Sequence, residues 1–498
     1  MWDRLSGLSG RQTGKSVLLL AIVALGGFLR FYQIGSEGLW LDEAFSVWLA
    51  RQPVGEMLSW VVRIDQHPPL YYTLLHFWIL LLGDGPATVR ALSALFSVLT
   101  IPVVYLLGRR LAPEHEQVGL LAALLLAVSP FHVHLAQEAR MYTLLALTAS
   151  LALYALTGWL DHKTHLTWPG YMVFTAATLL THNTAIFFPL AANLFVLSLH
   201  QIRRRNTRYA ISNWLTAQAA VFLLWLPWLP AFLAQSAAVY REFWLPAPTW
   251  ETVFGTVGVF LVDYLPLSLV GICAVGVLIV GLALSGLLHF RRQPARIAFL
   301  LIIFATPFLG EGLVSLYRPI FYDRTLIWAS IPFYLLLAAG LYRLRRRPCV
   351  IAVALIAVLT LTSLSLREYY VHFEKEQWDD AATFVAERVR PDDLILFNAT
   401  WAQIPFDYYF HRLYNCPVAE HGAPVDLFDR GILEPKMAAG DLPRLRALVQ
   451  NHERVWLVYS HDGYTDPQGL IPPALEEAFD LLERQNFHGL HVWLFRRE

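Results

Sequence analysis

Charge and cysteine are both scarce in this sequence. Charged residues make up 15% of the 498 positions and cancel to a formal net charge of +0, whereas a soluble domain carries roughly 25% charged residues. A chain without net positive charge offers no electrostatic case for binding nucleic acid. The three cysteines, Cys273, Cys349 and Cys416, lie far apart, so neither a disulfide framework nor a zinc site is indicated.

The signatures of several enzyme classes are missing as well. The chain has no Walker A sequence, no GxGxxG sequence and no GxSxG nucleophile elbow, so nucleotide-driven transport and hydrolase chemistry lose support. Apolar runs are abundant instead, because 56% of the residues are hydrophobic and the mean hydropathy is +0.46. A large soluble helical protein would have to bury too many helices that are apolar all round.

Hydropathy therefore predicts a polytopic membrane protein. Arg4, Arg11 and Lys15 precede the first apolar run, but no small-residue cleavage site follows it, so we interpret the run as a retained first helix. Segments 67–83 and 252–264 are interpreted as interfacial or partly re-entrant helices. About eleven spans are predicted, near residues 17–34, 87–108, 117–133, 142–160, 167–182, 184–200, 210–233, 265–288, 296–316, 325–342 and 348–366.

The basic residues predict the orientation of these spans. With the N-terminus in the cytoplasm, all of the basic clusters fall on the cytoplasmic side, as the positive-inside rule requires. These clusters are at 108–110, 203–208, 289–296 and 343–348. We expect a plasma (inner) membrane protein whose other segments face outward. These outer segments are 35–86, 131–141, 182–183, 234–264, 317–324 and everything after residue 366.

The last part of the chain has a different pattern. Helix and strand signals alternate there, which predicts a small α/β domain on the outer face. The predicted domains are thus a membrane domain over 1–366, with a first external loop at 35–86, and an extracytoplasmic domain over 367–498. The C-terminal elements are helices at 376–389, 441–451 and 473–484 and strands at 393–399, 454–460 and 490–497.

An acidic pair stands in the first outer segment. Asp42 and Glu43 lie among tryptophans in GLWLDEAFSVWLA, and a carboxylate near the membrane boundary is costly unless it faces water, a partner or a substrate. Capping of a helix that begins here is the simpler interpretation. Adjacent helical residues project about 100° apart, so we expect the two acids to have different surroundings and different roles.

Two further residues of this region suit an anion. His67 stands in DQHPPLYY, where two prolines predict a helix N-terminus, and such a terminus can bind phosphate or form a simple interfacial cap. Arg90 opens the second predicted span. Its side chain could extend to lipid phosphate or bind a substrate phosphate through its planar fork.

The segment SPFHVHLAQEARMYTLL places Glu138, Arg140 and Tyr142 on the outer side between two apolar spans. An internal pair of Glu138 with Arg140 is the simple alternative, but residues two apart do not face each other on a helix. The remaining outer candidates are His182 and Asn183, and then Tyr322 and Arg324.

Together these residues predict a cavity at the outer membrane boundary. Carboxylates would serve base chemistry, arginines would hold phosphate, and aromatic residues would contact a sugar or an apolar tail. A phosphate-activated lipid substrate fits that inventory.

Four motifs carry a resemblance to a known family. The chain resembles bacterial members of the dolichyl-phosphate-mannose protein mannosyltransferase superfamily, which comprises glycosyltransferase family 39 and relatives such as the aminoarabinose transferases. The similarity covers roughly residues 15–345. The motifs, in chain order, are LWLDEAFSVWLA, HPPLYY, RALSALFSVLTIPVVYLLGRRL and SPFHVHLAQEARMYTLL.

This resemblance implies a GT-C membrane fold and a hexosyl- or pentosyltransferase that uses a polyprenyl-phosphate-sugar donor on the outer face. It implies Asp42 as the base toward an acceptor hydroxyl, with Glu43 as a structural or metal-side neighbour, and Arg90 on the donor phosphate. Some relatives bind a divalent metal at the acidic pair, but no ligand spacing here settles a metal requirement. The acceptor stays open among lipid, glycan and protein.

Within this interpretation the candidate residues divide by role. Arg90, Arg140, Arg324 and His67 are predicted to hold the donor phosphate. Glu138, Tyr142, His182, Asn183 and Tyr322 are predicted to line the acceptor or sugar pocket. The alternatives are a transporter or flippase of polyprenyl-linked sugars, which would distribute polar groups through the membrane depth, and a sensor or assembly protein whose working part is the C-terminal domain.

Overall fold

The computed structural model describes residues 2–159, 164–203, 208–241, 245–426 and 436–497. The chain divides into two units, which we treat separately. The helical unit comprises Met1–Ile34, Asp65–Leu74 and Arg90–Phe373, and the mixed unit comprises Gly35–Ile64, Leu75–Val89 and Glu374–Glu498. Most of the predicted first external loop thus groups with the C-terminal residues.

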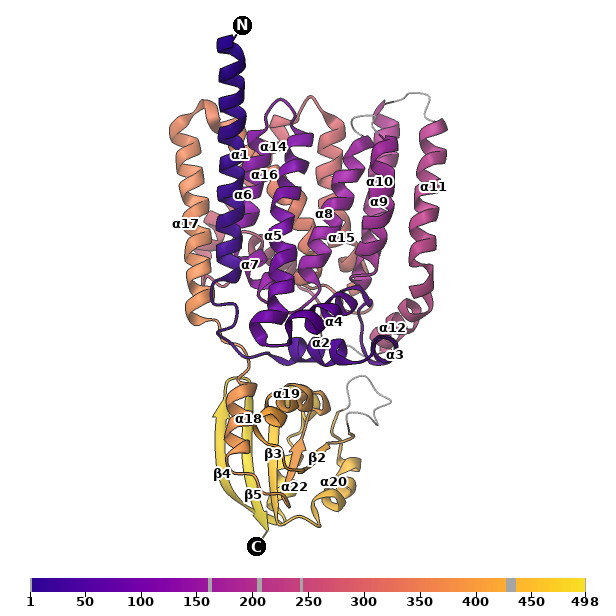
Figure 1. Ribbon diagram of the computed structural model, residues 1–498, viewed down its shortest axis with the longest axis vertical. Helices are drawn as coiled ribbons and strands as arrows, with labels where there is room; N and C mark the ends of the chain where they lie inside the picture. Colours follow the sequence, from indigo (N-terminus) through magenta and orange to yellow (C-terminus); the bar gives the residue numbers. More distant parts are fainter. Residues whose placement is uncertain (1, 160–163, 204–207, 242–244, 427–435, 498) are drawn as a thin grey trace. The chain divides into compact units, whose positions relative to one another are not determined.

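The helical unit consists of long apolar helices that run alongside one another (Figure 1). Its helices are α1 (Trp2–Phe31), α5 (Pro86–Leu111), α6 (Gln117–Ala127), α7 (Pro130–Ala136), α8 (Tyr142–Leu156), α9 (Thr164–Leu179), α10 (Phe187–Arg203), α11 (Arg208–Trp225), α12 (Leu229–Arg241), α13 (Trp250–Val259), α14 (Leu269–His289), α15 (Pro294–Ser315), α16 (Ser330–Arg343) and α17 (Pro348–His372). The 3-10 segments Asn183–Ile186 and Asp323–Ala329 precede α10 and α16.

Helix length and composition make the chain a multi-pass membrane protein. Among the described residues, eight helices are long and apolar enough to cross a membrane, and nine if α6 and α7, which meet at 57°, form one span. Each of the eleven predicted spans contains a helix, but α8 has only 15 residues and α9 only 16, short of the roughly 20 that a bilayer core requires. Helix length and apolar composition therefore do not reproduce the predicted count of eleven crossings.

The short helix α8 is enclosed by protein. All of its residues except Leu151 and Tyr154 are buried, so its length is set by neighbouring helices as well as by apolar composition. Residues 137–141 in front of it are not helical. The predicted interfacial segment 67–83 forms α4 (Leu70–Leu82), an apolar helix of 13 residues that is too short for a full span.

The mixed unit contains helices from the first loop and an α/β domain. Its loop helices are α2 (Leu41–Arg51) and α3 (Val54–Ile64), together with the end of α4. The strands are β1 (Leu394–Phe397), β2 (Ala419–Gly422), β3 (Arg454–Ser460), β4 (Phe479–Phe487) and β5 (Leu490–Arg497). The remaining helices are α18 (Trp378–Ala386), α19 (Gln403–Leu413), α20 (Leu442–Val449), α21 (Asp462–Thr465) and α22 (Ile471–Glu476).

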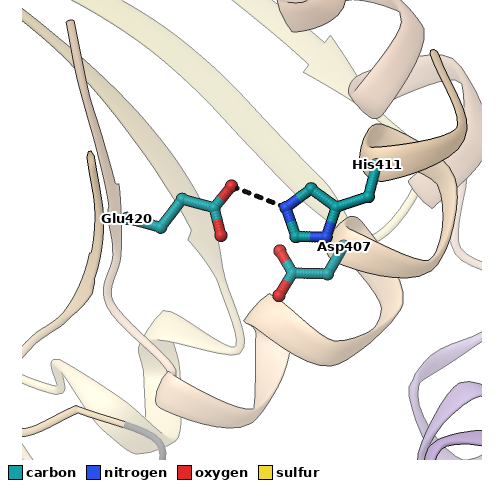
Figure 2. Close-up of side chains that lie close together, drawn as sticks. All are labelled: Asp407, His411 and Glu420. Atoms are coloured by element: carbon teal, nitrogen blue, oxygen red, sulfur yellow. Dashed lines mark hydrogen bonds and ion pairs between the residues drawn. The ribbon is translucent and has the colours of Figure 1, made fainter. Parts of the chain in front are cut away.

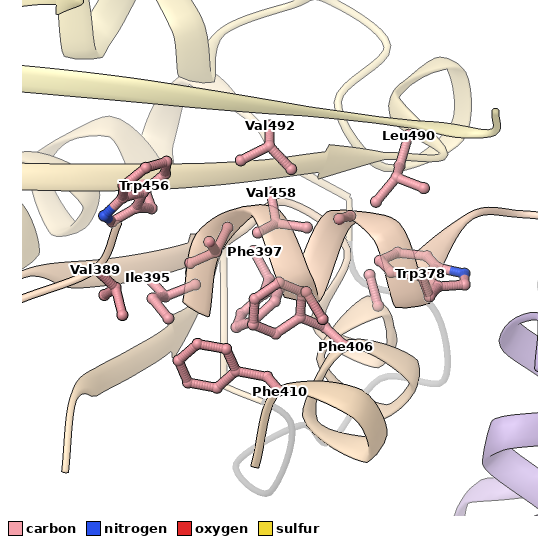
Figure 3. Packing of buried hydrophobic residues seen from close by; sticks show 14 of the residues in the cluster. Trp378, Val389, Ile395, Phe397, Phe406, Phe410, Trp456, Val458, Leu490 and Val492 are labelled. Carbon is pink, nitrogen blue, oxygen red and sulfur yellow. The ribbon is translucent and has the colours of Figure 1, made fainter. Parts of the chain in front are cut away.

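The five strands form one sheet in the order β2-β1-β3-β5-β4. β1 pairs in parallel with β2 and β3, and β5 pairs antiparallel with β3 and β4. Ile395 and Phe397 point to the face covered by α18 and α19 (Figure 3), whereas Leu394 and Leu396 join the core under α20 and α22. Successive strand residues face opposite sides, so β1 is apolar throughout because both faces are covered.

Most predicted elements of this domain are confirmed, and one is wrong in part. The helix predicted at 473–484 ends at Glu476 in α22, and the following residues form strand β4. β4 lies at the edge of the sheet and exposes most of its residues, so it lacks the apolar alternation that identifies a strand. Helix α19 and strand β2 were not predicted.

Candidate functional site

The helical unit carries its polar candidates where α7 and α8 are interrupted. Ser129 caps α7 by accepting a hydrogen bond from the backbone N–H of His132 at 3.3 Å, which suits serine at this position. Residues 137–141 then leave the helical conformation before α8 begins at Tyr142. Glu138 and Arg140 lie in this interruption and are 1% and 4% exposed. A buried, non-helical stretch with ionisable side chains is a functional-site candidate.

Arg30 fixes the start of this region and was not predicted. Its buried guanidinium donates to the carbonyls of Leu126 and Ala127 at 3.1 and 2.9 Å and its Nε donates to Ser97 Oγ at 2.7 Å. The two carbonyls belong to the last turn of α6, where helical acceptors lack partners. Arg30 therefore stabilises the break between α6 and α7.

Glu138 connects two elements through its two oxygens. Its Oε1 lies 3.0 Å from His134 Nε2, and its Oε2 accepts from Arg324 Nη1 at 3.3 Å. Tyr264 contacts the same histidine, with its hydroxyl 2.7 Å from His134 Nδ1. Glu138 pairs with Arg324, and it therefore orients a guanidinium that is predicted to hold phosphate.

A second group gathers around His67. His67 Nδ1 lies 2.9 Å from Asp65 Oδ1, and the rings of His67 and His182 are 5.0 Å apart. Burial acts to raise the pKa of Asp65, but His67 and Arg140 outweigh it and hold that pKa below its usual value. Burial also lowers the pKa of His182, and His67 and Arg140 lower it further. Asp65, His67, Arg140 and His182 thus form one electrostatic group.

The other residues predicted to line the acceptor or sugar pocket contact either aromatic rings or polar groups of neighbouring segments. The ring of Tyr142 lies 6.1 Å from that of His182, and Arg324 stacks over the ring of Tyr322. The amide of Asn183 donates to Gln66 O at 2.7 Å and to Gln235 Oε1 at 2.8 Å. Both amide hydrogens of Asn183 are therefore used to join segments of the protein.

Arg90 lies in the first turns of α5 and is 2% exposed. Its Nη1 donates to the carbonyl of Ile34 at 3.1 Å. This arginine is therefore held inside the protein and is not extended along a surface.

Asp263, beside this region, provides a test of burial. Burial raises its pKa to about 6, Asp323 adds to the rise, and His134 and Arg324 oppose it. Because the folded pKa exceeds the unfolded value of 3.8, the folded state binds the extra proton between these two values, so stability falls as pH rises from about 3.8 to about 6 and then levels off. We expect the Asp263 contribution to fall by roughly 1 kcal/mol per pH unit in that window. Asp263→Asn, which cannot ionise, should remove this contribution when thermal unfolding is compared at about pH 4.5 and pH 6. An equal slope in both proteins would contradict this assignment.

The acidic pair belongs to the other unit, where the structure gives the two acids different surroundings. Glu43 is 0% exposed and its Oε2 lies 3.0 Å from Lys375 Nζ, an ion pair that is buried on both sides. Asp42 is partly exposed. Lys375 lies in the C-terminal part of the chain, so this pair joins α2 to that part within the mixed unit.

The start of α2 is also held by C-terminal residues. No side chain of its own N-cap residue caps it; instead Glu376 Oε2 accepts from the backbone N–H of Leu41 at 3.1 Å. Glu376 Oε1 lies 3.3 Å from His461 Nε2. Burial acts to lower the pKa of His461, but Glu376 and Asp42 outweigh it and raise that pKa. His461 therefore lies within the electrostatic reach of Asp42, and both carboxylates favour its protonated form.

The sheet explains why His461 stands there. His461 directly follows β3, at the carboxyl end of that strand. β1 and β3 are parallel neighbours, and the chain continues from β1 to β2 in one direction across the sheet and from β3 to β4 in the other. Ligands of open α/β sheets bind at such switch points. Asn398, which follows β1, donates to the carbonyl of Ser460 at 2.8 Å and fixes the end of the neighbouring strand.

The acidic pair does not fit a metal in this structure. Glu43 already faces the cation of Lys375 at 3.0 Å, and neither acid belongs to a set of three or more ligands in the described part of the chain. One set does exist there, formed by Asp407, His411 and Glu420 of the mixed unit. Its location was not predicted.

Comparison with known proteins gives the fold. The family described as dolichyl-phosphate-mannose-protein mannosyltransferase matches residues 66–230. ArnT from Cupriavidus metallidurans in the apo state has a similar structure, with a TM-score of 0.67 over 97% of this chain and 98% of ArnT at 14% identity. The chain has a GT-C fold, which it shares with ArnT.

Two more structures share this GT-C fold. ArnT from the same organism bound to undecaprenyl phosphate matches with a TM-score of 0.64 at 14% identity, over 97% of this chain and 98% of ArnT. The oligosaccharyltransferase of Archaeoglobus fulgidus in complex with Zn and sulfate matches with a TM-score of 0.59 at 14% identity, over 96% of this chain and 72% of that protein. A search of curated proteins found no match.

Several residues of the GT-C protein described above had no signal in local sequence. Lys375, Glu376 and His461 lie more than 300 positions from the acidic pair they surround. Glu311, buried in α15, accepts from Thr325 Oγ1 at 2.7 Å and could have been singled out as an acid inside an apolar span.

Proposed function

We propose that this protein is an integral-membrane glycosyltransferase that moves a sugar from a polyprenyl-phosphate-linked donor to a lipid, glycan or protein acceptor. The observation that carries the proposal is the buried, non-helical stretch around Glu138 and Arg140 in a GT-C fold. The family match over residues 66–230 and the ArnT structure bound to undecaprenyl phosphate support the same class of donor. The reaction would take place on the outer face of the plasma membrane.

The helical unit is proposed to bind the donor phosphate. Arg90, Arg140 and Arg324 are cations, and His67 lies three residues before α4, within the same unit. Arginine forms charge-assisted hydrogen bonds with phosphate oxygens, and these become stronger as the leaving phosphate gains charge in the transition state. Tyr142, His182, Tyr322, Asn183 and Glu138 would then orient the sugar or the acceptor directly or through these cations.

Asp42 is proposed to be the base. The acceptor hydroxyl attacks the anomeric carbon, its proton passes to the Asp42 carboxylate, and the bond to the phosphate oxygen breaks with its electron pair leaving on polyprenyl phosphate. One carboxylate is enough for a single displacement that inverts the anomeric configuration. Glu43 is assigned a positioning role because its carboxylate is occupied by Lys375.

The proposal is tested by reconstituting the full chain in lipid with a panel of polyprenyl-phosphate sugars and candidate acceptors. The expected result is release of polyprenyl phosphate and formation of a glycosylated acceptor with one donor of the panel. Movement of an intact lipid-linked sugar across the bilayer without cleavage would favour the flippase instead.

Arg90→Ala is expected to raise the KM for the donor by about 10- to 100-fold, since a hydrogen bond to a charged group contributes about 1.5–3 kcal/mol. Steady-state transfer against donor concentration measures this change. Arg109→Ala is the matched control, because Arg109 lies at the opposite end of α5 and is 55% exposed. A donor KM that is unchanged in Arg90→Ala would remove Arg90 from phosphate binding.

A further inference from the structure

A cluster of ligand-type side chains lies in the mixed unit, on residues that the proposed transfer does not use. Asp407 and His411 are four residues apart on α19, so they share one helix face. Glu420 lies on the neighbouring strand β2. His411 Nε2 is 3.1 Å from Glu420 Oε1, and one ligand atom from each of the three residues lies within 4.8 Å of the other two (Figure 2).

A second observation concerns Asp407 alone. Its Oδ1 is buried and has no hydrogen-bond partner among the described residues. A buried carboxylate oxygen without a partner is costly, and a cation in contact with it would offset that cost.

The surroundings of the cluster match those of a bound ion. Gln403 Nε2 donates to Glu420 Oε2 at 3.2 Å and so orients a ligand from outside, as second-shell groups do at metal sites. His411 is 57% exposed, which provides a path for entry. Asp407 and His411 also line a cavity of about 390 Å³ together with Trp48, Arg51 and Arg412, where water could complete the coordination.

The donor set indicates the class of ion. One imidazole nitrogen and two carboxylates suit Zn²⁺ or Mn²⁺, whereas Ca²⁺ and Mg²⁺ are bound through oxygen alone. With bonds of about 2.0–2.2 Å, donors in a tetrahedral site are separated by roughly 3.4 Å. The 3.1 Å between His411 and Glu420 is already near that value, and the ligand atom of Asp407 lies within 4.8 Å of both.

We propose that Asp407, His411 and Glu420 bind one divalent transition-metal ion of the Zn²⁺ or Mn²⁺ class. The ion links α19 to β2, and α19 packs against α2, the helix that carries Asp42. The site is thus a structural clamp on the helix that presents the proposed base. It does not depend on the proposed sugar transfer, because metal binding can be measured without any substrate.

The test uses the full chain purified in detergent, stripped with a chelator and titrated separately with Zn²⁺ and Mn²⁺. The expected result is saturable binding of one ion of at least one of these metals and a higher melting temperature on loading. Glu420→Gln and His411→Ala are each expected to weaken binding at least about tenfold and to abolish the rise in melting temperature. His452→Ala is the control, because His452 is a histidine of the same unit outside the cluster, bonded through Nδ1 to Asp392 O at 3.2 Å.

Two results would overturn the proposal. One is no saturable binding of either metal by the wild-type protein. The other is equal affinity in the wild type and in the Glu420→Gln variant, which is nearly isosteric. If His411→Ala does not fold, as judged by gel filtration, Glu420→Gln alone decides the outcome.

Discussion

Asp42→Asn is expected to lower the rate of sugar transfer by about 10²- to 10⁴-fold, which is the usual contribution of a general base. The substitution keeps the size of the side chain and removes only its ability to accept the proton. The melting temperature and donor KM should stay close to those of the wild type, because Asp42 is partly exposed and the proposed phosphate ligands belong to the helical unit.

The control for this experiment is Glu56→Gln. Glu56 is an exposed carboxylate in the first turn of α3, in the same unit as Asp42. It should transfer sugar at the wild-type rate. A wild-type rate in Asp42→Asn as well would contradict the base assignment, and a loss in Glu56→Gln would indicate a general effect of removing negative charge.

Breaking the buried ion pair should have the largest effect on stability. Lys375→Met leaves the carboxylate of Glu43 buried without its partner at 3.0 Å, and removing one member of a buried pair costs about 3–5 kcal/mol. Replacing both residues, as Glu43→Gln with Lys375→Met, should restore much of that loss because no unpaired charge remains. Chemical or thermal unfolding of the purified variants measures both effects.

The matched control is an exposed ion pair, which tests whether the stabilisation by the Glu43–Lys375 pair depends on its burial. Arg446 Nη2 and Glu477 Oε2 form a similarly short pair of 2.7 Å whose side chains are 51% and 58% exposed. Surface pairs contribute about 0–1 kcal/mol, so Arg446→Met should change stability little. Equal losses in Lys375→Met and Arg446→Met would show that burial does not set the strength of the Glu43 pair.

The helices and the α/β domain could be predicted because their signals are local. Apolar runs locate α1, α5, α14 and α17, and short apolar runs rich in branched and aromatic residues locate β1 and β3. The number of crossings could not be predicted in this way, since α8 is short and enclosed by protein. Strand β4 was missed because an edge strand has no second covered face to impose a pattern.

The candidate site was predictable to a lesser degree. The segment around Glu138 could be recognised because polar residues between apolar spans are costly. The sequence does not show which acid of the pair forms a buried ion pair. That depends on Lys375, which is 332 positions from Glu43. Glu376 and His461 were likewise unremarkable in sequence, and only the folded sheet brings them to the start of α2.

The most direct test of the account is mass spectrometry of lipid-linked sugars in cells that lack this protein and are complemented with either the wild type or Asp42→Asn. We predict that one polyprenyl-phosphate sugar accumulates in the Asp42→Asn cells, while one glycosylated product disappears, and that the wild type reverses both changes. Identical pools of donor and product in the two strains, at equal expression, would contradict a polyprenyl-phosphate-dependent glycosyltransferase with Asp42 as its base.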